Sequence, residues 1–164
     1  MDSGTYRNLL AQRPVLRQSW ERLLRIEKTT SPLANPDALV HLLDTTLDEI
    51  FRHLAWRSPR RHPDLASAAQ CPCGRNPLLA YYAAGRQALR EALVGAQAAN
   101  PGLTIQARDQ DLGVLNEVFD QIARREIESF CGICQFRDAA HGEGRDHVAR
   151  VAVAGDTTHS SRSR

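Results

Sequence analysis

The chain has 164 residues, 42% of them hydrophobic and 24% charged, and its formal net charge is +2. This composition is typical of one globular domain, and the mixing of basic with acidic residues argues against a nucleic-acid-binding surface. The apolar runs are far shorter than the roughly 18 residues that a membrane span needs, and the first residues lack the pattern of a secretory signal. We therefore expect a cytoplasmic protein with reduced thiols and no membrane partner. Lys28 is the only lysine, and the arginine- and alanine-rich composition is typical of a GC-rich bacterial genome.

The first predicted helix covers about residues 6–28. Its apolar residues recur at helical spacing, at Leu9, Leu16, Trp20, Leu23 and Leu24. Pro14 is expected either to start the main part of this helix or to kink it. The turn-forming residues at 29–35 end the helix.

The same residue pair, Asn-Pro, opens the second and the third predicted helix, at Asn35-Pro36 and Asn76-Pro77. Asparagine is a strong N-cap, and proline suits the first helical position because its missing N–H would have no partner there. An apolar stripe follows the first pair, at Leu39, Leu43, Leu47, Ile50 and Leu54. A long irregular connection over residues 56–75 separates the two helices, and its basic start is more typical of a solvated helix end than of a phosphate site.

The fourth predicted helix begins near Asp109 or Asp111 and runs into the Cys-Gly-Ile-Cys stretch at 131–134. Glycine, serine, threonine and charged residues dominate the segment after it. We therefore predict a helical bundle domain over residues 1–137 and a mostly disordered tail over residues 138–164. Short links favour antiparallel neighbours, so the sequence predicts an all-α fold, an antiparallel bundle of four main helices.

The four cysteines fall into two close pairs. Cys71 and Cys73 precede the third helix, and Cys131 and Cys134 end the fourth. In an antiparallel pair the start of one helix lies beside the end of the next, so the four sulfurs should gather at one end of the bundle. Four thiolates suit a tetrahedral Zn²⁺ site and equally suit an iron–sulfur cluster. We predict a metal centre at these residues, with the choice between zinc and iron–sulfur left open.

Two other interpretations of the cysteines compete with the metal centre. Cys71 and Cys73 lie just before a helix start, where the positive end of the helix dipole favours a reactive thiolate, so they could form a redox dithiol. A helix C-terminus disfavours a thiolate, which argues against the same role for Cys131 and Cys134. Cysteine is also among the most buried residue types, so all four could be inert.

The third helix carries a second candidate site at Tyr82 and Gly85. The small residues at 83–85 would let another helix, or a ligand, approach closely, and a ligand pocket could form there. Tyrosines at helical spacing are, however, more often part of a core.

The sequence names no catalytic residue, because it contains no phosphate-binding glycine loop, no His-Glu-x-x-His motif and no recognisable nucleophile with its base. We therefore lean against an enzyme and expect a regulatory, redox-sensing or metal-supported interaction protein. The alternatives are a thiol oxidoreductase or electron carrier that uses Cys71 and Cys73, and a metal-free helical sensor or adaptor. An apolar helix face that four helices leave uncovered would be open to a protein partner or to a second copy in a homodimer.

Overall fold

The computed structural model describes residues 1–26, 35–56, 71 and 74–133, and all regular elements in these ranges are helical. They are α1 (Ser3–Ala11), α2 (Arg13–Ile26), α3 (Pro36–Leu39), the 3₁₀ turn η2 (Val40–Leu42), α4 (Leu43–Trp56), α5 (Leu78–Ala98) and α6 (Ile105–Gly132). The predicted all-α fold is confirmed. The predicted tail at residues 138–164 lies outside the described residues. Within the described residues, no helix has both the length and the apolar character that a membrane span requires.

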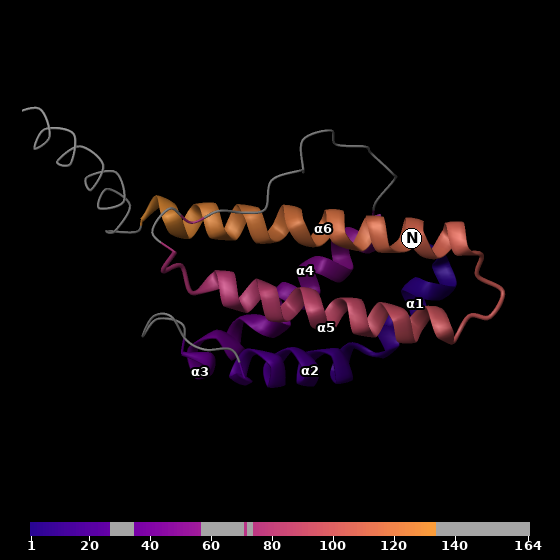
Figure 1. Ribbon diagram of the computed structural model, residues 1–164, viewed down its shortest axis with the longest axis horizontal. Helices are drawn as coiled ribbons and strands as arrows, with labels where there is room; N and C mark the ends of the chain where they lie inside the picture. Colours follow the sequence, from indigo (N-terminus) through magenta and orange to yellow (C-terminus); the bar gives the residue numbers. More distant parts are fainter. Residues whose placement is uncertain (27–34, 57–70, 72–73, 134–164) are drawn as a thin grey trace, which may run out of the picture.

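The long helices lie side by side, with α5 between α2 and α6 (Figure 1). Helices α5 and α6 form an antiparallel pair, and α4 contacts both α2 and α6. The short helix α1 packs near the end of α5, where the Asn8 side-chain amide donates a hydrogen bond to the carbonyl of Ala96 at 3.3 Å. The structure is thus a helical bundle in which α5 contacts α1, α2 and α6.

The N-terminal helix starts earlier than predicted and is divided in two. The carboxylate of Asp2 accepts hydrogen bonds from the backbone N–H groups of Gly4 and Thr5, both at 2.9 Å, and so caps α1. Helix α1 ends at Ala11, and Pro14 is the second residue of α2. A proline is tolerated in a first helical turn because its N–H is not needed there, so the chain begins a new helix just before it.

The region after residue 35 runs antiparallel to α2. Asn35 accepts a hydrogen bond from the backbone N–H of Asp37 at 3.0 Å, which confirms the predicted helix start at this Asn-Pro pair. Arg25, near the end of α2, pairs with Asp37 at 2.8 Å. Arg17, about two turns earlier in the same helix, pairs with Asp44 at 3.1 Å. Exposed ion pairs of this kind contribute little stability. They show the antiparallel direction, because the later residue of α2 pairs with the earlier residue of the other segment.

Helix α6 begins at Ile105, several residues before the predicted start at Asp109 or Asp111. The hydroxyl of Thr104 accepts a hydrogen bond from the backbone N–H of Ala107 at 3.2 Å and serves as the N-cap. Threonine and aspartate are both common N-cap residues, and the helix starts after Thr104 rather than near Asp109 or Asp111. Asp111 is buried within the first turns of α6, where it accepts a hydrogen bond from the backbone N–H of Asp2 at 2.7 Å.

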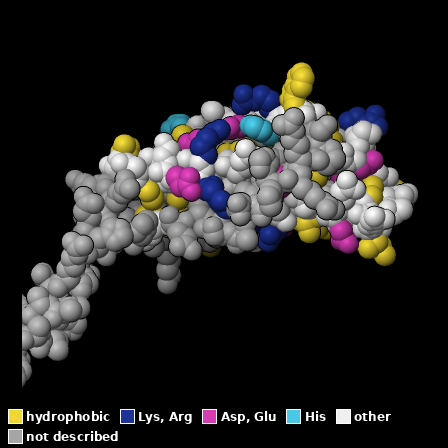
Figure 2. Space-filling model, turned by 90° about the horizontal axis from the view of Figure 1, so that it is seen from above, with side chains coloured by type: hydrophobic (Ala, Val, Ile, Leu, Met, Phe, Trp, Pro, Cys, Tyr) yellow, Lys and Arg dark blue, Asp and Glu magenta, His cyan; other side chains and the backbone are white. Residues whose placement is uncertain are grey.

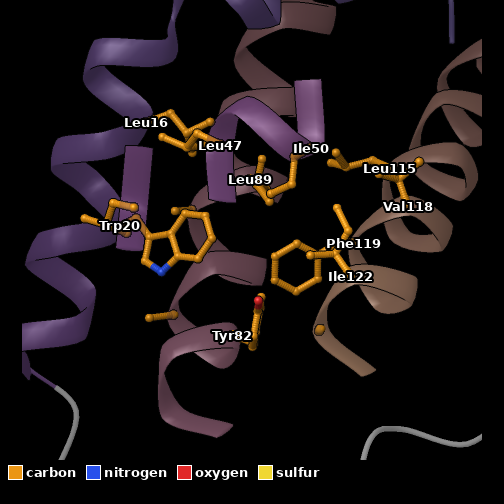
Figure 3. Packing of buried hydrophobic residues seen from close by; sticks show 14 of the residues in the cluster. Leu16, Trp20, Leu47, Ile50, Tyr82, Leu89, Leu115, Val118, Phe119 and Ile122 are labelled. Carbon is orange, nitrogen blue, oxygen red and sulfur yellow. The ribbon is translucent and has the colours of Figure 1, made fainter. Parts of the chain in front are cut away.

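The core lies where α2, α4, α5 and α6 meet, and Figure 3 shows side chains from these helices pointing toward one another. Trp20 of α2 is fully buried, and its indole N–H donates a hydrogen bond to the carbonyl of Tyr81 at 3.0 Å. The Tyr81 hydroxyl donates to the Thr46 hydroxyl of α4 at 2.9 Å. Phe119 of α6 completes the aromatic group, with its ring centroid 6.2 Å from that of Trp20.

Gly85 is the point at which Trp20 approaches α5 most closely. A Cβ atom at this position would lie 2.2 Å from Cζ2 of Trp20, closer than any real contact between such atoms. Only glycine therefore lets the indole lie against the backbone of α5.

We expect Gly85→Ala to lower the free energy of unfolding by about 2 kcal/mol, because the new methyl group overpacks the core. Gly113→Ala is the matched control, since a Cβ at that helical glycine meets nothing within 4 Å. The control should gain up to about 1 kcal/mol from the higher helix propensity of alanine. Urea unfolding followed by circular dichroism measures both changes. Equal stability of the two variants would show that Trp20 does not lie against Gly85.

Burial makes the core sensitive to alkaline pH. It raises the pKa of Tyr81 to about 12, against a value of about 10 for an unfolded tyrosine. Between these two values only the unfolded chain releases the proton, so the free energy of unfolding should fall as the pH rises from 10 to 12. In Tyr81→Phe this part of the decline should be absent. Urea unfolding at several pH values tests this, and parallel declines in both proteins would contradict it.

Candidate metal centre

The structure describes two of the four predicted ligands, and Cys73 and Cys134 lie outside the described residues. Cys131 is the penultimate residue of α6, where it is partly buried and packs against the hydrophobic core. Cys71 is partly buried as well, and its carbonyl accepts a hydrogen bond from the backbone N–H of Gly74 at 3.0 Å. Gly74 has φ +64°, a left-handed conformation that favours glycine.

Asn76 shows that the start of α5 lies beside the end of α6. Its side-chain amide donates hydrogen bonds to the carbonyl of Ile127 at 3.0 Å and to Sγ of Cys131 at 3.3 Å. The same arrangement of the two helix ends is visible in Figure 1. The predicted antiparallel neighbourhood of the two helices is therefore confirmed, and it places Cys131 beside Asn76, which follows Cys71 by five positions in the chain.

The Asn-Pro pair explains why Asn76 is available for this contact. The side-chain oxygen of Asn76 accepts a hydrogen bond from the backbone N–H of Leu78, the first residue of α5, at 3.0 Å. Asn76 is only 2% exposed, so its amide has no access to bulk water and needs protein partners. The Leu78 donor and the Ile127 acceptor together fix which end of the amide faces α6. An N–H group, and not the oxygen, therefore faces the sulfur.

Two helix ends of opposite polarity meet at this site. The C-terminal end of α6 carries a partial negative charge and the N-terminal end of α5 a partial positive charge. From the sequence only the first of these is evident at Cys131, and on that basis we expected a thiolate to be disfavoured there. The nearby start of α5 and the Asn76 N–H group act in the opposite direction, because both favour negative charge on the sulfur.

No group of three histidine, cysteine, aspartate or glutamate side chains with metal-binding geometry occurs in the part of the chain that the structure describes. The predicted four-cysteine set includes two residues outside that part. Thiolates are the ligands that both zinc and iron–sulfur clusters accept, and the N–H group at Cys131 is the kind of outer partner that such ligands have. The donor chemistry at Cys131 thus fits a metal-bound thiolate.

Tyr82 and Gly85, the second candidate site, belong to the core. Tyr82 is 5% exposed, and its ring lies edge-on to Phe119 with 5.6 Å between the centroids. The Trp20 indole fills the space beside Gly85. The sequence left open whether the small residues admit a helix or a ligand, and the structure places a helix there. The predicted ligand pocket is therefore replaced by the packing of α2 on α5.

An ion-pair cluster between α4 and α6 was not predicted from the sequence. Arg125 pairs with Glu49 at 2.9 Å and with Glu126 at 2.7 Å, and His53 lies 3.7 Å from Glu49. The hydrogen bond from Arg125 is the main cause that lowers the pKa of the Glu49 carboxyl. Glutamate and histidine four residues apart on α4 gave a weak signal, but the arginine partner comes from a distant helix.

On the face that Figure 2 shows, basic, acidic and histidine side chains lie among apolar and uncharged ones.

Comparison of the chain with protein-family models, curated proteins and solved structures gave no significant match.

The structure predicts a clear difference between the two Asn-Pro pairs. Asn35→Ala should lower the free energy of unfolding by about 1 kcal/mol, because it removes an exposed helix cap. Asn76→Ala should cost about 2–3 kcal/mol, because it removes a cap and also leaves the carbonyl of Ile127 without its side-chain donor. Urea unfolding of both variants tests this. Equal losses would mean that Asn76 serves only as a cap.

Proposed function

We propose that Cys71, Cys73, Cys131 and Cys134 bind a metal, Zn²⁺ or an iron–sulfur cluster, at the end of the bundle where α5 starts and α6 ends. The protein then acts as a small helical regulatory protein of a reducing, cytoplasmic compartment. Its centre either responds to redox conditions or metal supply, or holds a surface in shape for a protein partner.

The hydrogen bond from Asn76 to the sulfur of Cys131 carries this proposal. A buried N–H group aimed at a sulfur stabilises a thiolate, which is the form that binds metals. The chain spacing supports the rest, because Cys71 lies five positions before Asn76 and Cys134 lies three positions after Cys131 in the sequence. All four cysteines are thus close along the chain to the two helix ends that meet here.

A metal bound by these cysteines would link the segment before α5 to the end of α6 through its ligand bonds. Zinc held by both cysteine pairs would tie the segment before α5 to the end of α6 and so contribute directly to folding stability. A cluster would do the same and would make this link sensitive to oxidation. In both cases the chain's own contribution is to hold Cys131 beside the start of α5 in a partly buried place.

A thiol oxidoreductase or electron carrier is the second candidate, and the position of Cys71 favours it. Cys71 and Cys73 precede the positive end of α5, where a thiolate is stabilised. Dithiol turnover that survives the replacement of both Cys131 and Cys134 by serine would support this role over the metal centre.

Metal analysis tests the proposal directly. Protein purified without oxygen and without a metal-binding tag should contain about one zinc per chain, or iron with sulfide and absorbance near roughly 400 nm. Cys131→Ser should lose the metal and melt at a lower temperature, because one of four ligands is gone. His53→Gln is the control for loosely bound metal and should keep the full content. Unchanged metal content and melting temperature in Cys131→Ser would refute the proposal.

A further inference from the structure

Asn76 makes hydrogen bonds in two directions. Its oxygen accepts from the backbone N–H of Leu78 in the first turn of α5, at 3.0 Å. Its nitrogen donates to the carbonyl of Ile127 and to the sulfur of Cys131 in the last turns of α6, at 3.0 and 3.3 Å. One buried planar group thus connects the sulfur with the start of another helix.

The other Asn-Pro pair shows that helix capping does not require this second arm. Asn35 accepts a hydrogen bond from the backbone N–H of Asp37 at 3.0 Å, the same bond that Asn76 makes to Leu78. Asn35 is exposed, whereas Asn76 is buried between two helices. The side-chain NH₂ group of Asn76 is therefore not needed for capping, and its hydrogen bonds connect Asn76 to α6.

The amide of Asn76 is planar, so its two sides cannot move independently. A metal-bound sulfur carries negative charge and attracts the N–H group more strongly than an oxidised or capped sulfur does. If the attraction to Cys131 is lost, the amide is held less firmly, and its oxygen is held less firmly against Leu78. One turn beyond Leu78 lies Tyr81, whose carbonyl accepts the indole N–H of Trp20 at 3.0 Å.

We propose that Asn76 transmits the chemical state of the Cys131 sulfur to the first turn of α5, as a positioning residue of the metal centre. Its regulatory meaning rests on the proposed function, because metal release or oxidation would be the event that is transmitted. The link itself needs only Cys131, Asn76 and Leu78, and so can be measured in a protein that binds no metal.

Amide hydrogen exchange of Leu78 measures the link. The full-length protein with Cys71, Cys73 and Cys134 replaced by serine cannot assemble the centre and retains Cys131 as its one thiol. Adding Cys131→Ala to this protein should speed the exchange of the Leu78 N–H about fivefold, the size of effect that a weakened helix cap produces. The Asp37 N–H, which Asn35 caps, should exchange at an unchanged rate in the same spectra.

Asn76→Ser provides the decoupled protein, because serine keeps a capping oxygen and lacks the amide donor. In that background Cys131→Ala should no longer affect Leu78. Should Cys131→Ala fail to fold, methylthiolation of Cys131 in the folded protein replaces the substitution, with the same expected change. An unaltered Leu78 rate, or an equal acceleration in the Asn76→Ser background, would overturn the inference.

The metal content of the unaltered protein separates this inference from the proposed function. Coupling at Leu78 without any bound metal would leave the link standing and refute the metal centre. Bound metal without coupling at Leu78 would refute the link and leave the metal centre standing.

Discussion

The contact of the Trp20 indole with the backbone at Gly85 sets the arrangement of the helices. No side chain larger than hydrogen fits at that position, so the indole can lie directly against α5. The indole N–H then reaches the carbonyl of Tyr81, and the hydroxyl of Tyr81 reaches Thr46. Helices α2, α5 and α4 are thereby held at one place by bonds that leave none of these polar groups unpaired. A core of this kind has one favoured arrangement, because any shift would leave a buried polar group without its partner.

The end of the bundle where α5 starts and α6 ends depends on this arrangement, because α5 belongs to both the core and that end. Asn76 lies just over one turn before Tyr81, so the helix start is held in place by the core next to it. Farther along, Arg86 pairs with Asp120 of α6, and its guanidinium lies 5.2 Å from the centroid of the Phe119 ring. These contacts prevent α5 and α6 from sliding past one another. The start of one helix and the end of the other therefore stay in register, and Cys131 stays within reach of Asn76.

Local chemistry explains which parts of the fold the sequence predicts. Both Asn-Pro pairs mark helix starts because a capping bond forms between residues two positions apart. The antiparallel pairing of α5 and α6 follows from the short link between them. The start of the main N-terminal helix near Pro14 was among the predicted alternatives. Two features were less accessible: the cap at Thr104 and the partner of Gly85. Gly85 indicates that another group approaches the backbone of α5 closely, but the protein sequence does not show whether that group is a ligand or a tryptophan from α2.

The candidate site was predictable in part for the same reason. The closeness of Cys131 to the start of α5 could be inferred from topology, since helix ends of antiparallel neighbours must meet. The donor that faces the sulfur could not, because Asn76 and Cys131 are 55 positions apart and a capping asparagine normally has no second role. A signal does exist in hindsight. The two Asn-Pro pairs look alike in sequence, but only the helix after the second pair is joined by a short link to the helix that carries Cys131 near its end.

The hydrogen bonding of Asn76 also explains how this end of the bundle keeps its shape. Burying an amide is unfavourable unless its donors and its acceptor find partners. Leu78 satisfies the oxygen, Ile127 accepts from the nitrogen, and the sulfur of Cys131 is the second acceptor for the same NH₂ group. The sulfur thus completes the bonding of a buried residue. A metal that binds to this sulfur would meet a ligand already held in place and already facing a donor, so less of its binding energy would be spent on ordering the site.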